Sequence, residues 1–198
     1  FVQQIEPGAI NWMTAGKGIV HSERRPESLA QQTYVNHGIQ LWTALPVAHE
    51  EVEPSFVHTP AAAIPEVQVD GATVRVLIGT AFGQTSPVAT YAPTLYLDIA
   101  LPAGATLEIP ALAQEMALYT VDAPVQINGQ PVDALMLAVM NTGQALRLTT
   151  AAEGGARLMV IGGDALDGPR HMWWNFVSSR KERIVQAAQD WEAQRFDP

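Results

Sequence analysis

The chain has 198 residues, of which 47% are hydrophobic and 16% charged, a globular composition long enough for one large or two small domains. It contains no cysteine, which excludes disulfides, thiolate metal ligands and cysteine nucleophiles and fits a cytoplasmic protein. The net charge of −9 argues against a direct nucleic-acid partner, and no apolar run approaches the roughly 18–20 residues that cross a membrane.

A histidine and a carboxylate follow a glycine-rich turn near the start of the chain. Gly16 and Gly18 shape the turn, and His21 and Glu23 come after it, two positions apart. On a β-strand, side chains two apart point to the same face, about 6–7 Å from each other, so both can lean toward one metal ion. An imidazole and a carboxylate suit Fe(II), Mn(II) or Zn(II). The pair alone is a weak signal, because two ligands do not make a metal site.

The other histidines and the tryptophans allow structural and functional interpretations. His37 is expected on or beside a strand with Trp42, either as a structural residue or as a substitute ligand or acid–base group. His49 and His58 flank an acidic, proline-bearing segment and are expected at the surface, whereas His171 precedes two tryptophans and is expected to pack. Large aromatic side chains favour core and interface packing, with a ligand-lining role for Trp42 as the alternative.

A candidate domain boundary lies near residues 54–66, where three prolines interrupt regular structure. We therefore expect three parts in the chain. They are a short all-β piece over residues 1–60, a complete all-β domain over 61–168, and a tail with a helix over 169–198.

Strand patterns dominate the middle of the chain. Apolar residues alternate with polar or small ones at 74–78, 95–101 and 107–109. Asp70-Gly71 and Asn128-Gly129 are favoured two-residue hairpin turns. Apolar runs at 134–140 and 158–161 predict buried strands. Turn signals recur about every 8–12 residues, which is typical of a β-sandwich or barrel.

The last part of the chain predicts a helix over about residues 180–194. Ser179 and Glu182 have the spacing of a capping box, with Ser179 as the N-cap. Basic residues occupy the first turn and acidic residues come late, the reverse of what the helix dipole favours. Either the basic end contacts an acidic surface elsewhere in the protein, or these charges are solvated and have no role.

Residues 12–23, with the sequence WMTAGKGIVHSE, resemble the signature of the pirin family, whose members are bicupins. The match continues through shorter motifs, which are HGIQLW at 37–42, GTAFG at 79–83, WNFV at 174–177 and KERI at 181–184. The resemblance covers nearly the whole chain.

The resemblance implies an all-β fold of two cupin barrels, each a double-stranded β-helix or jelly roll, with a short C-terminal helix. Residues 1–60 then form the C-terminal part of a metal-type N-terminal cupin, and 61–168 form the C-terminal cupin. Residues 169–198 form a tail and helix that pack back on the barrels.

The resemblance also implies a metal site. The first cupin of the family holds one metal, usually Fe(II), with Zn, Mn or Ni as alternatives, bound by three His and one Glu. By resemblance, His21 and Glu23 are two of these ligands. The other two, a His-x-His pair, would fall before Phe1. The N-terminal cupin is therefore expected to be incomplete here, and the metal could be absent from this chain.

Two functions follow from the resemblance. One is a metal-dependent oxygenase of quercetin 2,3-dioxygenase type, which acts on a small aromatic, flavonol-like substrate and is expected to be impaired in this chain. In that reaction Glu23 is also the expected general base, because a carboxylate within reach can accept a hydroxyl proton. The other function is a non-catalytic regulatory scaffold that binds a protein partner. An incomplete barrel would expose strand edges, so a homodimer is also expected.

Overall fold

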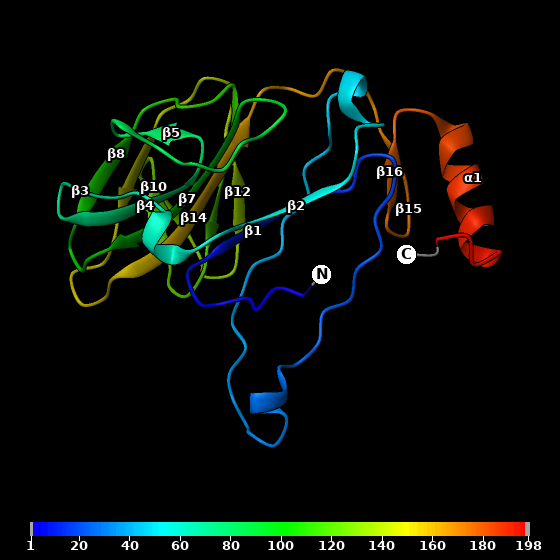
Figure 1. Cartoon of the computed structure of the whole chain (residues 1–198). Helices are drawn as coiled ribbons and strands as arrows, with labels where there is room; N and C mark the ends of the chain where they lie inside the picture. The colour runs from blue at the N-terminus through cyan, green and yellow to red at the C-terminus, as the bar shows by residue number, and fades with distance from the viewer. Residues whose placement is uncertain (1, 197–198) are drawn as a thin grey trace. The chain divides into compact units, whose positions relative to one another are not determined.

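The computed structural model describes residues 2–196 and divides the chain into two compact units (Figure 1). The first, which we call the barrel unit, consists of Glu6–Trp12 and His58–Ala165. The second, which we call the terminal unit, consists of Phe1–Ile5, Met13–Val57 and Leu166–Pro198. The expected division at residues 60 and 168 stays a prediction. Across the described residues, no helix is long and apolar enough to cross a membrane.

The barrel unit consists of two antiparallel sheets and a short ladder. The six-stranded sheet has the order β12-β9-β14-β7-β4-β3, with bounds Leu137–Val139, Glu115–Thr120, Ala156–Gly163, Thr94–Leu101, Ala72–Ile78 and Glu66–Val69. The four-stranded sheet has the order β11-β10-β13-β8, with bounds Gln130–Val132, Val125–Ile127, Leu146–Thr149 and Thr106–Ile109. The short ladder pairs β5 (Thr80–Ala81) with β6 (Gln84–Thr85), and η3 (Ala61–Ala63) is a single 3₁₀ turn.

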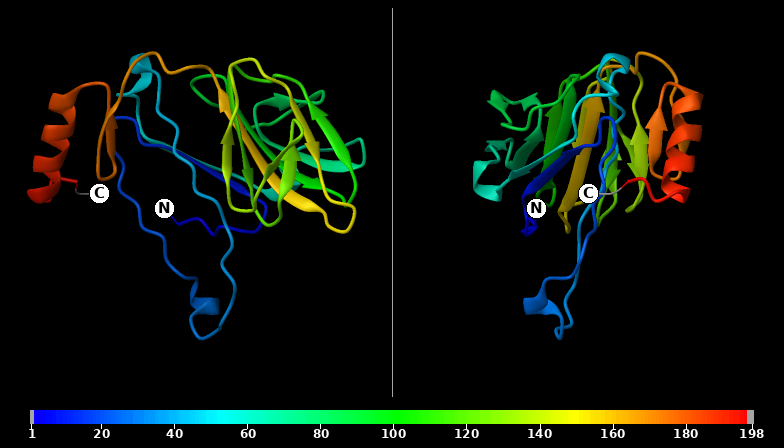
Figure 2. Two further views of the ribbon diagram at one scale, coloured as in Figure 1. Left: turned by 180° about the vertical axis from the view of Figure 1, so that it is seen from behind. Right: turned by 45° about the vertical axis from the view of Figure 1, so that its right-hand side comes forward.

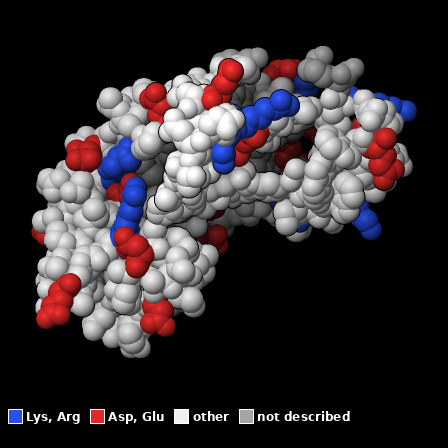
Figure 3. Space-filling view, turned by 90° about the horizontal axis from the view of Figure 1, so that it is seen from below, with Lys and Arg blue, Asp and Glu red and all other residues white. Residues whose placement is uncertain are grey.

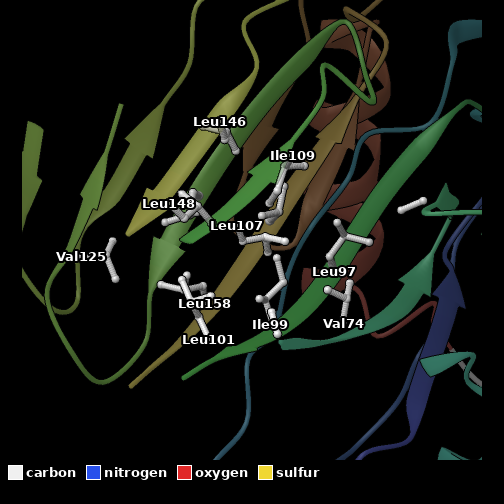
Figure 4. Close-up of a cluster of buried hydrophobic side chains, with 14 of the residues drawn as sticks. Val74, Leu97, Ile99, Leu101, Leu107, Ile109, Val125, Leu146, Leu148 and Leu158 are labelled. Atoms are coloured by element: carbon white, nitrogen blue, oxygen red, sulfur yellow. The ribbon is translucent and has the colours of Figure 1, made fainter. Parts of the chain in front are cut away.

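Aliphatic side chains from both sheets fill the interior of the barrel (Figure 4). Leu97 and Ile99 of β7 and Leu158 of β14 share one cluster with Leu107 of β8 and Leu148 of β13, and all five are fully buried. Every buried member of this cluster is Ala, Val, Leu, Ile or Met. Each large aliphatic side chain buried here stabilises the fold by roughly 1.5–3 kcal/mol. The cluster contains neither a histidine nor a carboxylate that could bind a metal.

The opposite face of the six-stranded sheet is covered as well. Tyr96 and Met159 are buried there in a second apolar cluster, and Ile10 and Trp12 pack against it. In β4 the pairing register shifts between Val76 and Ile78, which is a β-bulge or irregularity. The last residues of β4 are therefore buried in succession, although the sequence predicts alternation there.

The two predicted hairpin turns are confirmed. Asp70-Gly71 joins β3 to β4 and Asn128-Gly129 joins β10 to β11, and the φ angles of these residues are 50°, 83°, 52° and 78°. A two-residue turn of type I′ needs positive φ at both positions, which Asp, Asn and Gly tolerate best.

One predicted buried strand is wrong and the other is confirmed. The run at 158–161 lies in the central strand β14, where Leu158 and Val160 are fully buried. The run at 134–140 forms only the short edge strand β12, in which Leu137 is 54% and Val139 76% exposed. Within its sheet β12 pairs with β9 alone, so its other edge is open. Hydrophobicity alone does not distinguish an edge strand from a central one.

The terminal unit contains a hairpin, a helix and long irregular segments. The hairpin consists of β15 (His171–Trp173) and β16 (Phe176–Ser178), and α1 (Lys181–Glu192) lies beside it (Figure 2). The 3₁₀ turns η1 (Glu27–Leu29) and η2 (Val47–His49) interrupt the irregular chain. The strands β1 (Ile10–Thr14) and β2 (Ser55–Thr59) pair with each other, and their residues are divided between the two units. An all-β fold with a short C-terminal helix is therefore confirmed.

The predicted capping box is wrong, although the helix itself is confirmed. Arg180, not Ser179, is at the N-cap position, and no side chain caps the helix. The Ser179 hydroxyl instead donates a hydrogen bond to Glu50 Oε2 at 2.8 Å, and the Ser179 N–H donates to Glu50 Oε1 at 2.8 Å. A distant carboxylate therefore binds the side chain that local spacing assigns to the cap.

Candidate functional site

A tight turn over residues 15–18, which we call the glycine turn, precedes the candidate ligands. It closes through a hydrogen bond of 2.9 Å from Gly18 N–H to the Ala15 carbonyl. Lys17 N–H donates to the Val52 carbonyl at 3.0 Å. Gly16 has a φ of 51°, and a Cβ at this position would overlap the Val52 carbonyl. Gly18 has a φ of 141°, which side chains rarely tolerate. Gly16 is therefore required by its conformation and by this close approach, and Gly18 by its conformation.

His21 and Glu23 lie beyond this turn in an irregular segment, and both are exposed. The expectation that they share one face of a β-strand is wrong, because β1 ends at Thr14 and the glycine turn directs the chain away from it. Their role as metal ligands stays a prediction.

The described residues do not fit a complete cupin metal centre. Between residues 2 and 196, no group of three or more His, Cys, Asp or Glu side chains is placed to hold a metal ion. His21 and Glu23 can supply an imidazole nitrogen and a carboxylate oxygen, which are suitable donors for Fe(II). The three-His and one-Glu set of the family is not assembled from the described residues.

The local structure of the other four histidines differs from what the sequence predicts. His37 is exposed in an irregular segment, so its predicted place on or beside a strand is wrong. His49 ends η2 and is half-buried, and His58 in β2 lies 2.8 Å from Asn11 Oδ1 through its Nδ1. Neither is fully exposed as expected. His171 is exposed in β15, which contradicts the expectation that it packs.

Three tryptophans pack with other aromatic rings, but Trp173, Trp174 and Trp191 are 47%, 51% and 44% exposed, so the expected core packing is wrong for them. Trp174 lies 4.6 Å from Trp191 and 5.8 Å from Phe176 between ring centroids, and Trp173 stacks on Phe176 at 6.1 Å. These rings connect α1 to the β15–β16 hairpin. Trp42 is 56% exposed and lies on irregular chain, so no lining role for it is visible.

A buried ion pair in the terminal unit was not predicted from the sequence. Arg170 Nε lies 2.7 Å from Glu50 Oε1, and the two side chains are only 6% and 9% exposed. The Nε–H makes no well-aligned hydrogen bond, so this contact is an ion pair. Arg170 Nη2 also donates to the Leu45 carbonyl at 2.7 Å and to Asp167 Oδ1 at 2.5 Å. This arginine lowers the pKa of the Asp167 carboxyl, helped by a hydrogen bond from Val47 N–H.

Residues 50–53, which we call the acidic segment, also bind the start of the C-terminal helix. Glu51 Oε1 accepts hydrogen bonds from Arg183 Nε at 3.0 Å and from Arg180 Nη2 at 2.5 Å. The Arg183 hydrogen bond is the main reason that the pKa of Glu51 is lowered. Lys17 and Glu53 form a further ion pair. Of the two explanations for the basic helix start, contact with an acidic surface is confirmed.

The barrel unit has one buried charged cluster, on the outer face of its large sheet. The carboxylate of Asp98 accepts hydrogen bonds from Arg157 Nε at 2.9 Å and Nη2 at 2.7 Å, and Arg75 Nη1 lies 3.5 Å away. Burial, together with the Asp98 charge, raises the pKa of the neighbouring Tyr96 to about 12. On the face drawn in Figure 3, basic side chains lie near acidic ones and form no continuous basic patch.

Comparison with known proteins identifies the family. Residues 96–197 match the model of the pirin C-terminal cupin domain, and residues 2–43 match the model described as pirin. The chain belongs to the pirin family. The pirin C-terminal cupin match overlaps most of the barrel unit, whereas residues 2–43 form no barrel of their own, in agreement with the expected incomplete first cupin.

Two curated relatives and one solved structure illustrate this similarity. A pirin-like protein of Caulobacter vibrioides is 39% identical over 97% of this chain and 66% of its own length. A protein of Pseudomonas aeruginosa, provisionally named quercetin 2,3-dioxygenase, is 34% identical over 96% of this chain and 59% of its own length. A crystal structure of quercetin 2,3-dioxygenase from Acinetobacter baumannii superposes with a TM-score of 0.83 and 29% identity, covering 97% of this chain and 62% of that one. The chain thus spans about three fifths to two thirds of these relatives.

Proposed function

We propose that this pirin-family chain contributes to a metal-dependent oxygenase that acts on a small aromatic, flavonol-like substrate. The observation that carries the proposal is the His21-x-Glu23 pair directly after the anchored glycine turn, in a chain similar to proteins named quercetin 2,3-dioxygenase. His21 and Glu23 are the proposed metal ligands. Fe(II) is the metal we expect, with Zn, Mn or Ni as alternatives.

Glu23 has a second proposed role. A carboxylate that reaches a flavonol hydroxyl can accept its proton, which makes the bound substrate more electron-rich and more reactive toward oxygen. The side chain is exposed, so a substrate can approach it. The cysteine-free composition suits a cytoplasmic reaction.

For the 198 residues alone, we propose weak metal binding and impaired turnover. The described residues bring no third protein ligand to the pair, and a site with two protein donors leaves most coordination positions to water. An oxygenase usually presents at least three protein ligands in a facial arrangement.

Metal titration and quercetin turnover of the chain and its variants test this proposal. We expect Zn(II), used as a redox-inert probe, to bind with one weak site that His21→Ala and Glu23→Ala abolish. His37→Ala is the matched control, because His37 is also exposed on irregular chain of the same unit and should leave binding unchanged. Zn(II) binding that survives both substitutions would overturn the ligand assignment. Quercetin turnover at the rate of an efficient oxygenase would overturn the proposed impairment.

A second candidate function is a non-catalytic, protein-binding scaffold, favoured by the open apolar edge of β12. Leu135, Leu137 and Val139 are 68%, 54% and 76% exposed, and no charged residue lies between them. Natural proteins usually protect such an edge with charge or proline, so an unprotected one tends to pair. Sedimentation velocity should then show a homodimer that Leu137→Lys dissociates. A strictly monomeric chain would contradict self-association through this edge.

A further inference from the structure

The glycine turn is held from two directions within the terminal unit. On one side it bonds to the acidic segment, through Lys17 N–H and the Val52 carbonyl at 3.0 Å. On the other side it bonds to the C-terminal helix, because Arg183 Nη2 donates to the Lys17 carbonyl at 3.0 Å. Together, the two hydrogen bonds hold both the N–H and the carbonyl of Lys17, in the middle of the turn.

Arg183 itself is oriented by the acidic segment. Its Nε donates to Glu51 Oε1 at 3.0 Å, and its Nη2 lies 3.4 Å from Glu51 Oε2. Two nitrogens of the planar guanidinium therefore contact the two oxygens of the carboxylate. The arginine side chain is 33% exposed, which leaves it partly screened from water. A planar donor fork held in this way loses little further freedom when it also binds a backbone carbonyl.

A residue that follows the other end of the helix, Phe196, also contacts the turn. The Phe196 ring lies 3.3 Å from the position that a Cβ on Gly18 would occupy, and it stacks on Phe176 with centroids 5.6 Å apart. His21 follows Gly18 by only three residues. The conformation of the turn therefore determines where the chain carries the two candidate ligands.

We propose that Arg183 is a positioning residue, which locks the glycine turn from which His21 and Glu23 emerge. This inference rests on the proposed function for its consequence, metal affinity, but not for the lock itself. When Arg183 is lost, the Lys17 carbonyl loses its side-chain donor and the turn opens more often. The ligand pair then spends less time in one arrangement, so binding a metal has to order it first.

Amide hydrogen exchange in the metal-free chain tests the lock directly. Arg183→Ala should speed exchange at Lys17 and Gly18 by about tenfold, the effect of one lost hydrogen bond of ordinary net strength. Lys181→Ala is the matched control in the same helical turn, and exchange should change less than about twofold, because Arg183 and not Lys181 binds the Lys17 carbonyl. Unchanged exchange at Lys17 in Arg183→Ala would overturn the proposal.

Two further measurements separate positioning from a general loss of structure. Exchange at Ala187 in α1 should stay slow in Arg183→Ala. If the helix itself opens, Arg183→Met replaces it with the same expected result, because methionine keeps the helix propensity and removes every side-chain donor. Zn(II) affinity should fall about tenfold in Arg183→Ala. Adding Glu51→Gln should cause little further loss, since both residues act through one contact. Additive losses would overturn the coupling.

The outcomes also distinguish this inference from the proposed function. If His21→Ala leaves Zn(II) binding unchanged, the ligand assignment fails, while exchange at Lys17 still decides whether Arg183 locks the turn. If His21→Ala abolishes binding and Arg183→Ala changes neither exchange nor affinity, the ligand assignment stands and the lock fails.

Discussion

The barrel unit and the terminal unit are stabilised by different kinds of contact. In the barrel unit, long antiparallel ladders such as β7–β14 enclose a core cluster whose buried members are aliphatic side chains and methionine. In the terminal unit, ion pairs and stacked aromatic rings join irregular segments that lie far apart in sequence; Glu50 and Ser179, for example, are 129 positions apart. Apolar burial tolerates salt and moderate changes of pH, whereas ion pairs respond to both. The candidate ligands His21 and Glu23 lie in the terminal unit, whose ion pairs respond to salt and pH.

The largest expected effect comes from the barrel interior. Leu158→Ala should lower the free energy of unfolding by about 3–5 kcal/mol, because it leaves a cavity in a close-packed core. Leu137→Ala is the matched control in the same sheet, and since Leu137 is 54% exposed it should cost less than about 1 kcal/mol. Urea denaturation followed by circular dichroism measures both. Equal losses in the two variants would contradict the assignment of core and edge.

The next effect concerns the buried ion pair of the terminal unit. Arg170→Ala leaves the Glu50 carboxylate buried without its counter-charge, and we expect a loss of about 3 kcal/mol. Arg195→Ala removes an arginine that is 67% exposed and pairs with Asp190, so it should cost less than about 0.5 kcal/mol. Tryptophan fluorescence during urea unfolding reports mainly on this unit, which contains Trp42, Trp173, Trp174 and Trp191. If both arginine variants unfold alike, the buried pair does not stabilise the unit.

Tyr96 should give the barrel unit a pH limit at the alkaline end. Its pKa is raised to about 12 in the fold from an ordinary value of 10.0, so the folded state holds the proton more tightly than the unfolded state. Stability is therefore complete below pH 10 and falls by about 2–3 kcal/mol as the pH rises through 12. Tyr96→Phe should remove most of this fall in urea denaturation at pH 9 and 11. If the free energy of unfolding of Tyr96→Phe still falls as much between pH 9 and 11, another group is responsible for the fall.

The smallest expected effect is at Glu51, whose pKa the Arg183 hydrogen bond lowers below 4.5. The stabilising contribution is present above the unfolded pKa and is lost as the pH falls through the lowered folded value. The side chain is 44% exposed, so Glu51→Gln should cost less than about 1 kcal/mol, and less still in high salt. Thermal melts at pH 7 in low and high salt measure this difference. A loss that does not depend on salt would contradict an ion-pair origin.

Local sequence patterns predicted much of the barrel unit, because they reflect contacts close along the chain. Asp70-Gly71 specifies its hairpin by its own backbone preferences, and the alternation over 95–101 reflects the two faces of β7. The run at 134–140 was assigned wrongly to a buried strand because its burial depends on which neighbour the sheet provides on the far side. The residues of the run do not themselves determine whether another strand pairs with that side.

The terminal unit was less predictable, since its partners are distant. Ser179 fits a capping box by spacing, but Glu50 binds it from the other end of the chain. The sequence shows the spacing of His21 and Glu23 directly. It did not show that both lie on irregular chain, which follows from the positive φ angles of Gly16 and Gly18 after the end of β1. For the basic helix start, an acidic partner surface was one of two explanations that the sequence left open, and nothing in the sequence identified Glu51 as the residue involved.

Peptide-resolved hydrogen exchange of the whole chain, with and without Zn(II), tests the central claim most directly. We predict that peptides covering β7 and β14 exchange slowest under both conditions and that residues 19–26 exchange fastest without metal. Zn(II) should slow exchange in the glycine turn and in the segment that follows it, and nowhere in the barrel unit. Protection that appears in the barrel unit, or none at residues 15–26, would contradict a ligand pair held by the glycine turn.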